Sequence, residues 1–101
     1  MRIIVMFDLP VVTTADRKEY LRFRKYLVKN GFMMLQESVY CKIAPNSVSA
    51  DMIVQGIKKN KTQAGVIQVL KVTEKQYARM EYVTGKRRTD VIDSDERLIV
   101  L

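Results

Sequence analysis

Asp8 is the residue of this sequence best placed for chemistry. It follows the apolar run Ile3–Phe7 and precedes Leu9-Pro10, so we expect a carboxylate at the carboxyl end of a strand buried on both faces. Mg²⁺ binds one or two carboxylates together with waters and substrate phosphates. If a dimer axis passed near this strand end, two copies of Asp8 could face one ion. The alternative is that Asp8 only starts the turn, by accepting backbone N–H bonds.

Other kinds of site are excluded by composition. The chain has no His, which removes Ser-His-Asp hydrolysis, His acid–base catalysis and His-ligated zinc or iron. Its one cysteine, Cys41, allows no disulfide or Cys-rich metal site. A lone thiol in an apolar segment predicts a buried or half-buried strand residue, in keeping with a cytoplasmic location. No apolar run approaches the length of a membrane span, so we expect no membrane partner and no signal peptide.

Nucleotide-binding loops are equally unsupported. The four glycines are scattered and form neither a G-x-x-x-x-G-K nor a G-x-G-x-x-G pattern. The segment Val39-Tyr40-Cys41 carries one aromatic residue and no flanking glycine, unlike the aromatic strands on which RNA-recognition modules stack bases.

A basic helix stripe is the second candidate site. Thr13 and Asp16 have capping-box spacing, and Gly31 supplies a stop after about Asn30, so a helix is predicted between them. One stripe of this helix is apolar. The opposite stripe and its flank are cationic, and we predict nucleic-acid binding by Arg17, Lys18, Arg22, Lys25 and Lys29. The alternative reading is an ordinary solvated face, although such faces usually mix both signs of charge.

Overall charge supports a polyanion partner. The 101 residues include 18 Lys and Arg against 11 Asp and Glu, a net charge of +7. The length fits one domain with a single modest core, and the 48% hydrophobic content is that of an ordinary globular chain.

The elements that position these residues alternate in a recognisable order. Strands are predicted at 2–7, 32–36, 38–43 and 66–72, and helices at 13–30 and 48–59. Only Glu37 separates the second and third strands, so they form either a tight hairpin or one bent strand. In the second helix, Val48, Met52, Ile53 and Ile57 are expected to face the core. Thr73–Gln76 begins a short helix or turn. The order β-α-β-β-α-β predicts an α+β, ferredoxin-like fold with two helices on one face of an antiparallel sheet.

The C-terminal part has a different character. We expect residues 1–82 to form the ferredoxin-like domain and 83–101 a polar linker followed by an apolar strand, Arg97–Leu101. Such a strand must be covered, and adding it to a sheet edge, its own or a partner subunit's, would cover it. We therefore expect a homodimer. Between linker and strand, residues 90–96 hold four of the 11 acids, which could repel DNA or dock on a basic partner.

Several motifs together resemble one known family. Phe7-Asp8, the helix with Arg17 and Leu27, Gly31, and the stretch from Gln36 to Tyr40 are similar to the small CRISPR-associated protein that partners the spacer-integrating nuclease during CRISPR adaptation. The resemblance runs from residue 1 to about residue 82. Phe7–Pro10, Gly31–Gln36, Val72–Gln76 and Glu96-Arg97 look most like members from type II systems.

The resemblance implies a ferredoxin-like homodimer with C-terminal strands packed on the partner. It also implies a metal-dependent endonuclease acting on RNA or double-stranded DNA, with Asp8 as the catalytic Mg²⁺ (or Mn²⁺) ligand. In the adaptation complex the family's dimer bridges two dimers of the CRISPR integrase subunit and lies under the DNA to be inserted. Many members have Tyr where this chain has Phe7, so a role for that hydroxyl does not carry over.

Three functions therefore stand. The first is a DNA-binding adaptor bridging integrase dimers in antiviral spacer acquisition, with weak nuclease activity. The alternative is a true metal-dependent phosphodiesterase whose cleavage of nucleic acid is the biological role. The third is a toxin-like ribonuclease or small regulatory binding domain unrelated to CRISPR. The sequence leaves open the preference between RNA and DNA, and which basic residues contact DNA.

Overall fold

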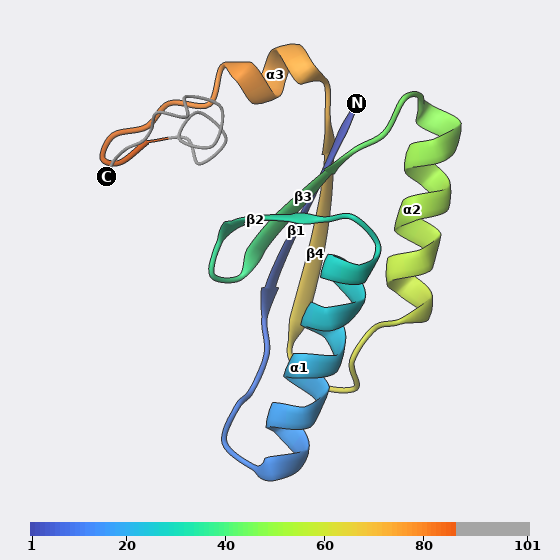
Figure 1. Cartoon of the computed structure of the whole chain (residues 1–101), viewed down its shortest axis with the longest axis vertical. Coiled ribbons are helices and arrows are strands. Elements are labelled where there is room, and N and C mark those ends of the chain that lie inside the picture. The colour runs from blue at the N-terminus through green and yellow to red at the C-terminus, as the bar shows by residue number, and fades with distance from the viewer. Residues whose placement is uncertain (87–101) are drawn as a thin grey trace.

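The computed structural model describes residues 1–86, and within them the predicted element order is present (Figure 1). The strands are β1 (Arg2–Asp8), β2 (Met33–Gln36), β3 (Val39–Ile43) and β4 (Val66–Val72), and the helices are α1 (Thr14–Lys29), α2 (Ser47–Lys59) and α3 (Glu74–Ala78). The predicted C-terminal strand at 97–101 and the acidic segment at 90–96 lie outside the described residues.

The four strands form one antiparallel sheet in the order β2-β3-β1-β4. Helices α1 and α2 lie on one side of this sheet, and α3 follows β4 at one end (Figure 1). The α+β, ferredoxin-like prediction is confirmed. We call the sheet surface away from α1 and α2 the open face.

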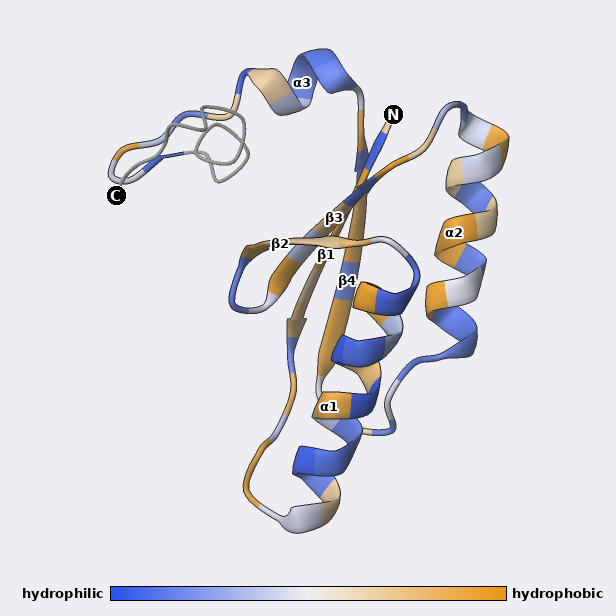
Figure 2. Ribbon diagram, in the orientation of Figure 1, coloured by the Kyte–Doolittle hydropathy of each residue, from blue (hydrophilic) through white to orange (hydrophobic). Residues whose placement is uncertain are grey.

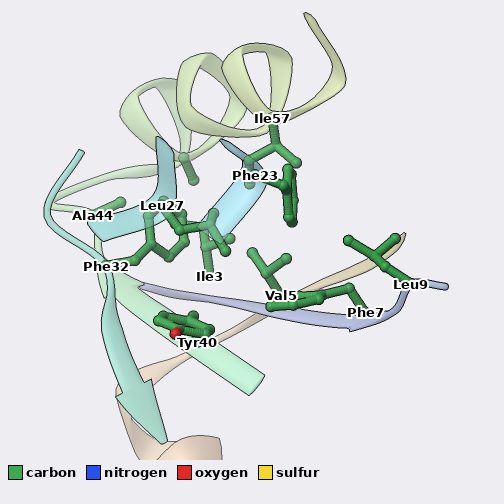
Figure 3. Close-up of a cluster of buried hydrophobic side chains, with 11 residues drawn as sticks. Ile3, Val5, Phe7, Leu9, Phe23, Leu27, Phe32, Tyr40, Ala44 and Ile57 are labelled. Atoms are coloured by element: carbon green, nitrogen blue, oxygen red, sulfur yellow. The ribbon is translucent and has the colours of Figure 1, made fainter. Parts of the chain in front are cut away.

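Strand β1 is central, as its apolar run predicted. Its alternate residues Ile3, Val5 and Phe7 are 0 to 5% exposed and belong to the main core beneath the helices. Figure 3 shows these side chains pointing toward those of α1 and α2. Tyr40 joins this core, and its ring stacks on Phe7 with centroids 5.8 Å apart. The core thus fixes the strand that ends at Asp8.

The ends of α1 are set by local sequence. Thr13 is the N-cap, and both halves of its capping box with Asp16 are formed. Asn30 is the C-cap, and Gly31 follows with a φ of 86°, a conformation that glycine adopts without steric cost. The buried residues Phe23 and Leu27 lie on the predicted apolar stripe. The basic residues of α1 are exposed, and Figure 2 shows hydrophilic and hydrophobic residues alternating along this helix.

The buried face of α2 corrects one prediction. Val48 and Met52 were expected in the core, but they are 69% and 70% exposed. The helix instead packs through Ala50, Ile53, Val54 and Ile57, which share one face at helical spacing. Val48 and Met52 lie on the opposite side of the same helix, because a helix turns 100° per residue.

Strands β2 and β3 pair as an antiparallel hairpin, so the alternative of one bent strand running through Glu37 is wrong. The register shifts between Met34 and Gln36, where a bulge interrupts the pairing. Cys41 of β3 is 1% exposed, as predicted, and packs with Ile4 and Tyr77 on the open face.

Candidate metal and nucleic-acid sites

Asp8 is the last residue of β1 and pairs with Val66 of β4. Because Ile3, Val5 and Phe7 point into the helical core, the alternation of a strand directs Asp8 to the open face. The carboxylate is exposed. It accepts no hydrogen bond from any group within residues 1–86, so the geometry lends no support to the turn-capping alternative.

Gly65 fixes the backbone at this strand end. It has a φ of 88°, and a Cβ placed on it would lie 2.7 Å from the Asp8 carbonyl oxygen and 2.7 Å from a methyl carbon of Leu9. Only glycine fits both the conformation and the space. Sequence reasoning noted Gly65 as one of four scattered glycines and missed this role, since the contact joins residues 57 positions apart.

One chain supplies only one carboxylate for a metal ion here. No group of three or more Asp, Glu, Cys or His side chains gathers in the described part of the molecule. Asp8 therefore fits Mg²⁺ or Mn²⁺ only as a partial site, completed by a second carboxylate, by phosphate oxygens or by both. An exposed carboxylate without a protein partner is chemically suited to that role.

The predicted cationic stripe divides into two groups. Lys18, Lys25 and Lys29 are exposed on α1, and their ammonium groups have no hydrogen-bond or ion-pair partner within residues 1–86. Lysine ammonium groups of this kind can meet phosphates along a duplex.

Arg17 and Arg22 are exposed too, but both serve the fold. Arg17 donates hydrogen bonds to the carbonyl oxygens of Val11 and Val12, at 3.2 and 3.0 Å, and so fastens the loop between β1 and α1. Arg22 pairs with Glu19 at 2.8 Å. This pairing lowers the pKa of the Glu19 carboxyl.

Arg22 also reaches a second helix. Its Nη2 donates to the carbonyl oxygens of Asn60 and Lys61, at 3.2 and 3.1 Å, where α2 ends. A cation at a helix C-terminus satisfies carbonyls that have no intrahelical donor. Arg22 thus joins α1 to the end of α2, which limits its freedom to turn toward a ligand.

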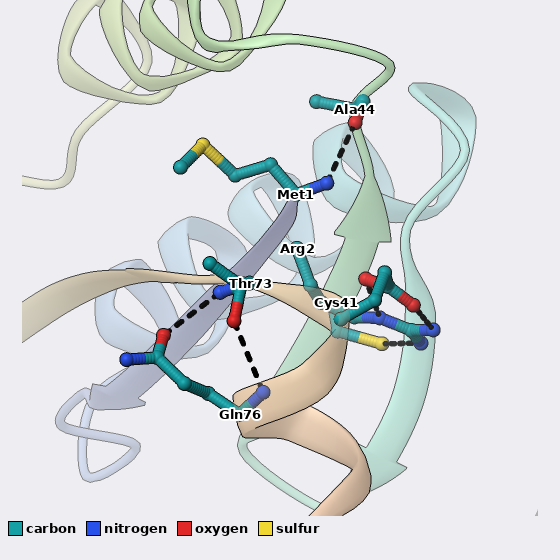
Figure 4. Close-up of polar contacts among 7 residues, drawn as sticks. Met1, Arg2, Cys41, Ala44, Thr73 and Gln76 are labelled. Atoms are coloured by element: carbon teal, nitrogen blue, oxygen red, sulfur yellow. Dashed lines mark hydrogen bonds and ion pairs between the residues drawn. The ribbon is translucent and has the colours of Figure 1, made fainter.

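Arg2 makes internal contacts that the sequence did not predict. It is 9% exposed and donates to both carboxylate oxygens of Glu74, at 3.1 and 2.7 Å. Its guanidinium lies 3.9 Å from the ring centroid of Tyr77 and 3.5 Å from the Cys41 sulfur. Figure 4 shows Arg2 beside Cys41, together with the hydrogen bonds of Thr73 with Gln76. Together these contacts hold α3 against the sheet.

The hydrogen bonds shift two pKa values in this cluster. The bonds to Glu74 raise the pKa of Arg2 above its ordinary value, and the same bonds lower the pKa of the Glu74 carboxyl. Both residues therefore keep their charge over the whole neutral range.

Across residues 1–86, none of the helices combines the length and apolar character needed to cross a bilayer.

Comparison with known proteins gives a consistent result. The family model described as CRISPR associated protein Cas2 matches residues 1–80. A protein of Treponema denticola named CRISPR-associated endoribonuclease Cas2 is 54% identical over the whole of both chains. A protein of Streptococcus mutans with the same name is 46% identical over all of this chain and 93% of its own length. The crystal structure of Streptococcus pyogenes Cas2 superposes with a TM-score of 0.61 at 21% identity, covering 83% of this chain and all of that chain. The chain belongs to the Cas2 family of CRISPR-associated proteins.

Proposed function

We propose that this protein is a homodimeric, DNA-binding adaptor of CRISPR spacer acquisition that also carries a metal-dependent endonuclease site at Asp8. Its partners are a second copy of the chain, the CRISPR integrase subunit and double-stranded DNA. The observation that carries the proposal is the row of exposed lysines on α1 that have no partner within residues 1–86, in a chain of net charge +7. The Cas2 family membership supplies the biological setting.

Phosphate contacts would be made chiefly by Lys18, Lys25 and Lys29. Arg17 and Arg22 would contribute charge to the same face while keeping the loop and α2 in place. Lysine binds phosphate as a point charge and reads no base sequence, so binding should be indifferent to sequence.

The open face supports a homodimer. Several of its apolar side chains are exposed, among them Met33 at 45%, Val66 at 54% and Leu70 at 50%. Exposed apolar side chains on one face of a sheet are candidates for burial against a partner. Pairing the open faces of two copies about a two-fold axis would bury these side chains. Both Asp8 carboxylates would then lie on the paired faces.

The metal proposal follows from that pairing. The two Asp8 carboxylates, one from each copy, would together hold one Mg²⁺ or Mn²⁺ ion, along with phosphate oxygens of the nucleic acid. Such an ion, when bound, lowers the pKa of a bound water and stabilises charge on a phosphodiester. The chain's own part is to hold the carboxylate at the end of β1, where Gly65 packs closely against the Asp8 backbone.

A salt titration tests the DNA-binding role. Each phosphate contact contributes about 0.9 log units of affinity per decade of salt concentration. Replacing Lys18, Lys25 and Lys29 with Ala should weaken duplex binding for every sequence and reduce the slope by about 2 to 3. Removing the same charge from Lys75, Arg79 and Lys86 is the control and should leave more of the slope in place. Equal effects of the two triple variants would refute the assignment to α1.

The second candidate function is a phosphodiesterase whose cleavage of nucleic acid is the biological role. It is favoured by the Asp8 carboxylate, which is exposed and has no partner within residues 1–86. Asp8→Asn removes the charge with almost no change of shape, at an exposed position. We expect it to abolish Mg²⁺-dependent cleavage of RNA or duplex DNA, and to leave spacer acquisition and dimer formation intact. Loss of acquisition in a well-folded Asp8→Asn dimer would favour the phosphodiesterase instead.

A further inference from the structure

Arg24 of α1 is held in place by a buried hydroxyl group. Its Nε donates a hydrogen bond to the phenol oxygen of Tyr40, at 2.8 Å. Tyr40 is 1% exposed, and its ring stacks on Phe7 in the main core. The guanidinium is therefore anchored at one nitrogen to the interior of the molecule, although Arg24 itself is exposed on the helix surface.

The anchoring bond leaves the other two nitrogens of the guanidinium open to a ligand. Within residues 1–86, neither Nη group of Arg24 has a hydrogen-bond or ion-pair partner. Arg17 and Arg22 differ, since each donates from an Nη group to backbone carbonyl oxygens. The hydrogen bond to Tyr40 raises the pKa of Arg24 above its ordinary value, which keeps the group charged. Arg24 is thus a fixed cation whose outer side is unused by the described part of the fold.

Arg24 borders a hollow on the surface of α1, which we call the α1 hollow. It measures about 390 Å³ and is lined by three cations and two aliphatic residues, Arg24, Lys25, Lys29, Leu21 and Val28. These residues lie three or four positions apart in sequence, so they share one side of the helix. Leu21 is 46% exposed and Val28 is 57% exposed. None of the described acidic side chains lines the hollow, so its ligand should be an anion with an apolar portion.

The backbone of a nucleic acid has this composition, because it alternates charged phosphates with sugar rings that present C–H groups. An arginine can donate two parallel hydrogen bonds to one phosphate, whereas a lysine acts as a point charge. A guanidinium that Tyr40 already holds loses little conformational freedom on binding. The α1 hollow therefore offers a directed contact to a phosphate, two point charges beside it and two aliphatic side chains for the adjoining sugar.

We propose that the α1 hollow binds one backbone phosphate and its sugar, with Arg24 donating to the phosphate through both Nη groups and Tyr40 acting as its positioning residue. The proposal rests on the DNA-binding role proposed above and deepens it. It adds to the lysines of α1 an arginine that the sequence pattern did not single out. It also gives the hydroxyl group of Tyr40 a part in binding, although Tyr40 is too buried to touch a ligand itself.

Salt titrations of duplex DNA binding by the full-length protein test the two roles separately. Arg24→Ala should raise the dissociation constant about tenfold near 0.1 M salt and reduce the slope by about 1, because one phosphate contact is lost. Tyr40→Phe keeps the ring and the charge of Arg24, so it should leave the slope unchanged and raise the dissociation constant about two- to fivefold. Arg24→Lys should also keep the slope and weaken binding, because the charge stays but the paired hydrogen bonds are lost.

A double variant and a charge-matched control complete the test. In the Arg24→Ala background, Tyr40→Phe should have no further effect on DNA binding, because its hydroxyl group acts only through Arg24. Arg79→Ala removes the same charge from an exposed arginine at the end of α3, outside the α1 hollow, and should reduce the slope less. Urea unfolding of each variant shows that the titrations are made on folded protein.

Three results would overturn the proposal. If Arg24→Ala weakens duplex binding no more than Arg79→Ala does, Arg24 does not hold a phosphate. If Tyr40→Phe weakens binding equally with and without the Arg24 side chain, its hydroxyl group is not a positioning group. If Arg24→Ala leaves duplex binding unchanged but weakens binding of the integrase subunit, the α1 hollow takes a protein carboxylate instead.

The triple lysine variant described above separates this failure from a failure of the proposed function. A reduced slope in the lysine variant, with no change in Arg24→Ala, contradicts the phosphate site in the α1 hollow and leaves the DNA-binding role of α1 standing. An unchanged slope in both variants contradicts both.

Discussion

Gly65 lies against the backbone of Asp8, so closely that a Cβ on the glycine would come 2.7 Å from the Asp8 carbonyl oxygen. Val66, the next residue, pairs with Asp8 across the two strands. The last residue of the central strand is therefore fixed by a loop that ends more than fifty residues later in the chain. This contact makes the candidate carboxylate part of the rigid sheet rather than of the following loop.

Gly65→Ala should destabilise the fold and displace Asp8. The left-handed conformation and the blocked Cβ together should cost about 2–3 kcal/mol of unfolding free energy. Gly85→Ala is the matched control, because Gly85 has a φ of 97° but a Cβ on it would meet no atom of the described residues within 4 Å. It should cost about 1 kcal/mol. Urea unfolding measures both, and equal losses would contradict the close contact with Asp8.

Arg2→Met should loosen α3. The substitution keeps an apolar stem but removes the paired hydrogen bonds to Glu74 and the contact with the Tyr77 ring. We expect a loss of about 1–3 kcal/mol in unfolding free energy and faster hydrogen exchange of the α3 amides. Lys75→Met, a cation to methionine change on the exposed side of α3, should change neither. Unchanged exchange in Arg2→Met would show that α3 is held by other contacts.

Stability should fall in acid partly through Glu74. Its pKa is lowered from the ordinary 4.5 in the folded protein, because Arg2 donates hydrogen bonds to the carboxylate. The unfolded chain therefore binds the proton more readily, so this stabilisation is complete above about pH 5 and is lost as the pH falls through the folded value. Glu74→Gln should show a smaller fall in unfolding free energy between pH 6 and pH 3. Parallel curves for the two proteins would contradict the pairing.

Truncation of two residues of α2 should lower the unfolding free energy by very different amounts. Ile57 is 2% exposed and Met52 is 70% exposed. Ile57→Ala should cost about 2–5 kcal/mol through a cavity in the main core, and Met52→Ala no more than about 0.5 kcal/mol. Thermal or urea unfolding compares them directly. A large loss of unfolding free energy in Met52→Ala would contradict the exposed position of Met52 and support its predicted place in the core.

The sequence by itself determined the elements, since their signals are local. The apolar run before Asp8, the capping box of Thr13 with Asp16 and the glycine after Asn30 act within a few residues, and each element appears where these signals predict it. The element order then left few arrangements for a chain of this length, so the fold class could be predicted as well.

Tertiary structure decided how the candidate residues are used. Which face of the sheet Asp8 occupies depends on strand register, and the packing of Gly65 against it joins distant parts of the chain. Similarly, the sequence predicts nucleic-acid binding by both Arg17 and Lys18. Only the fold brings backbone carbonyls to Arg17, and within residues 1–86 it brings none to Lys18. Long-range contacts of this kind depend on packing between elements, and no local pattern of residue types records them.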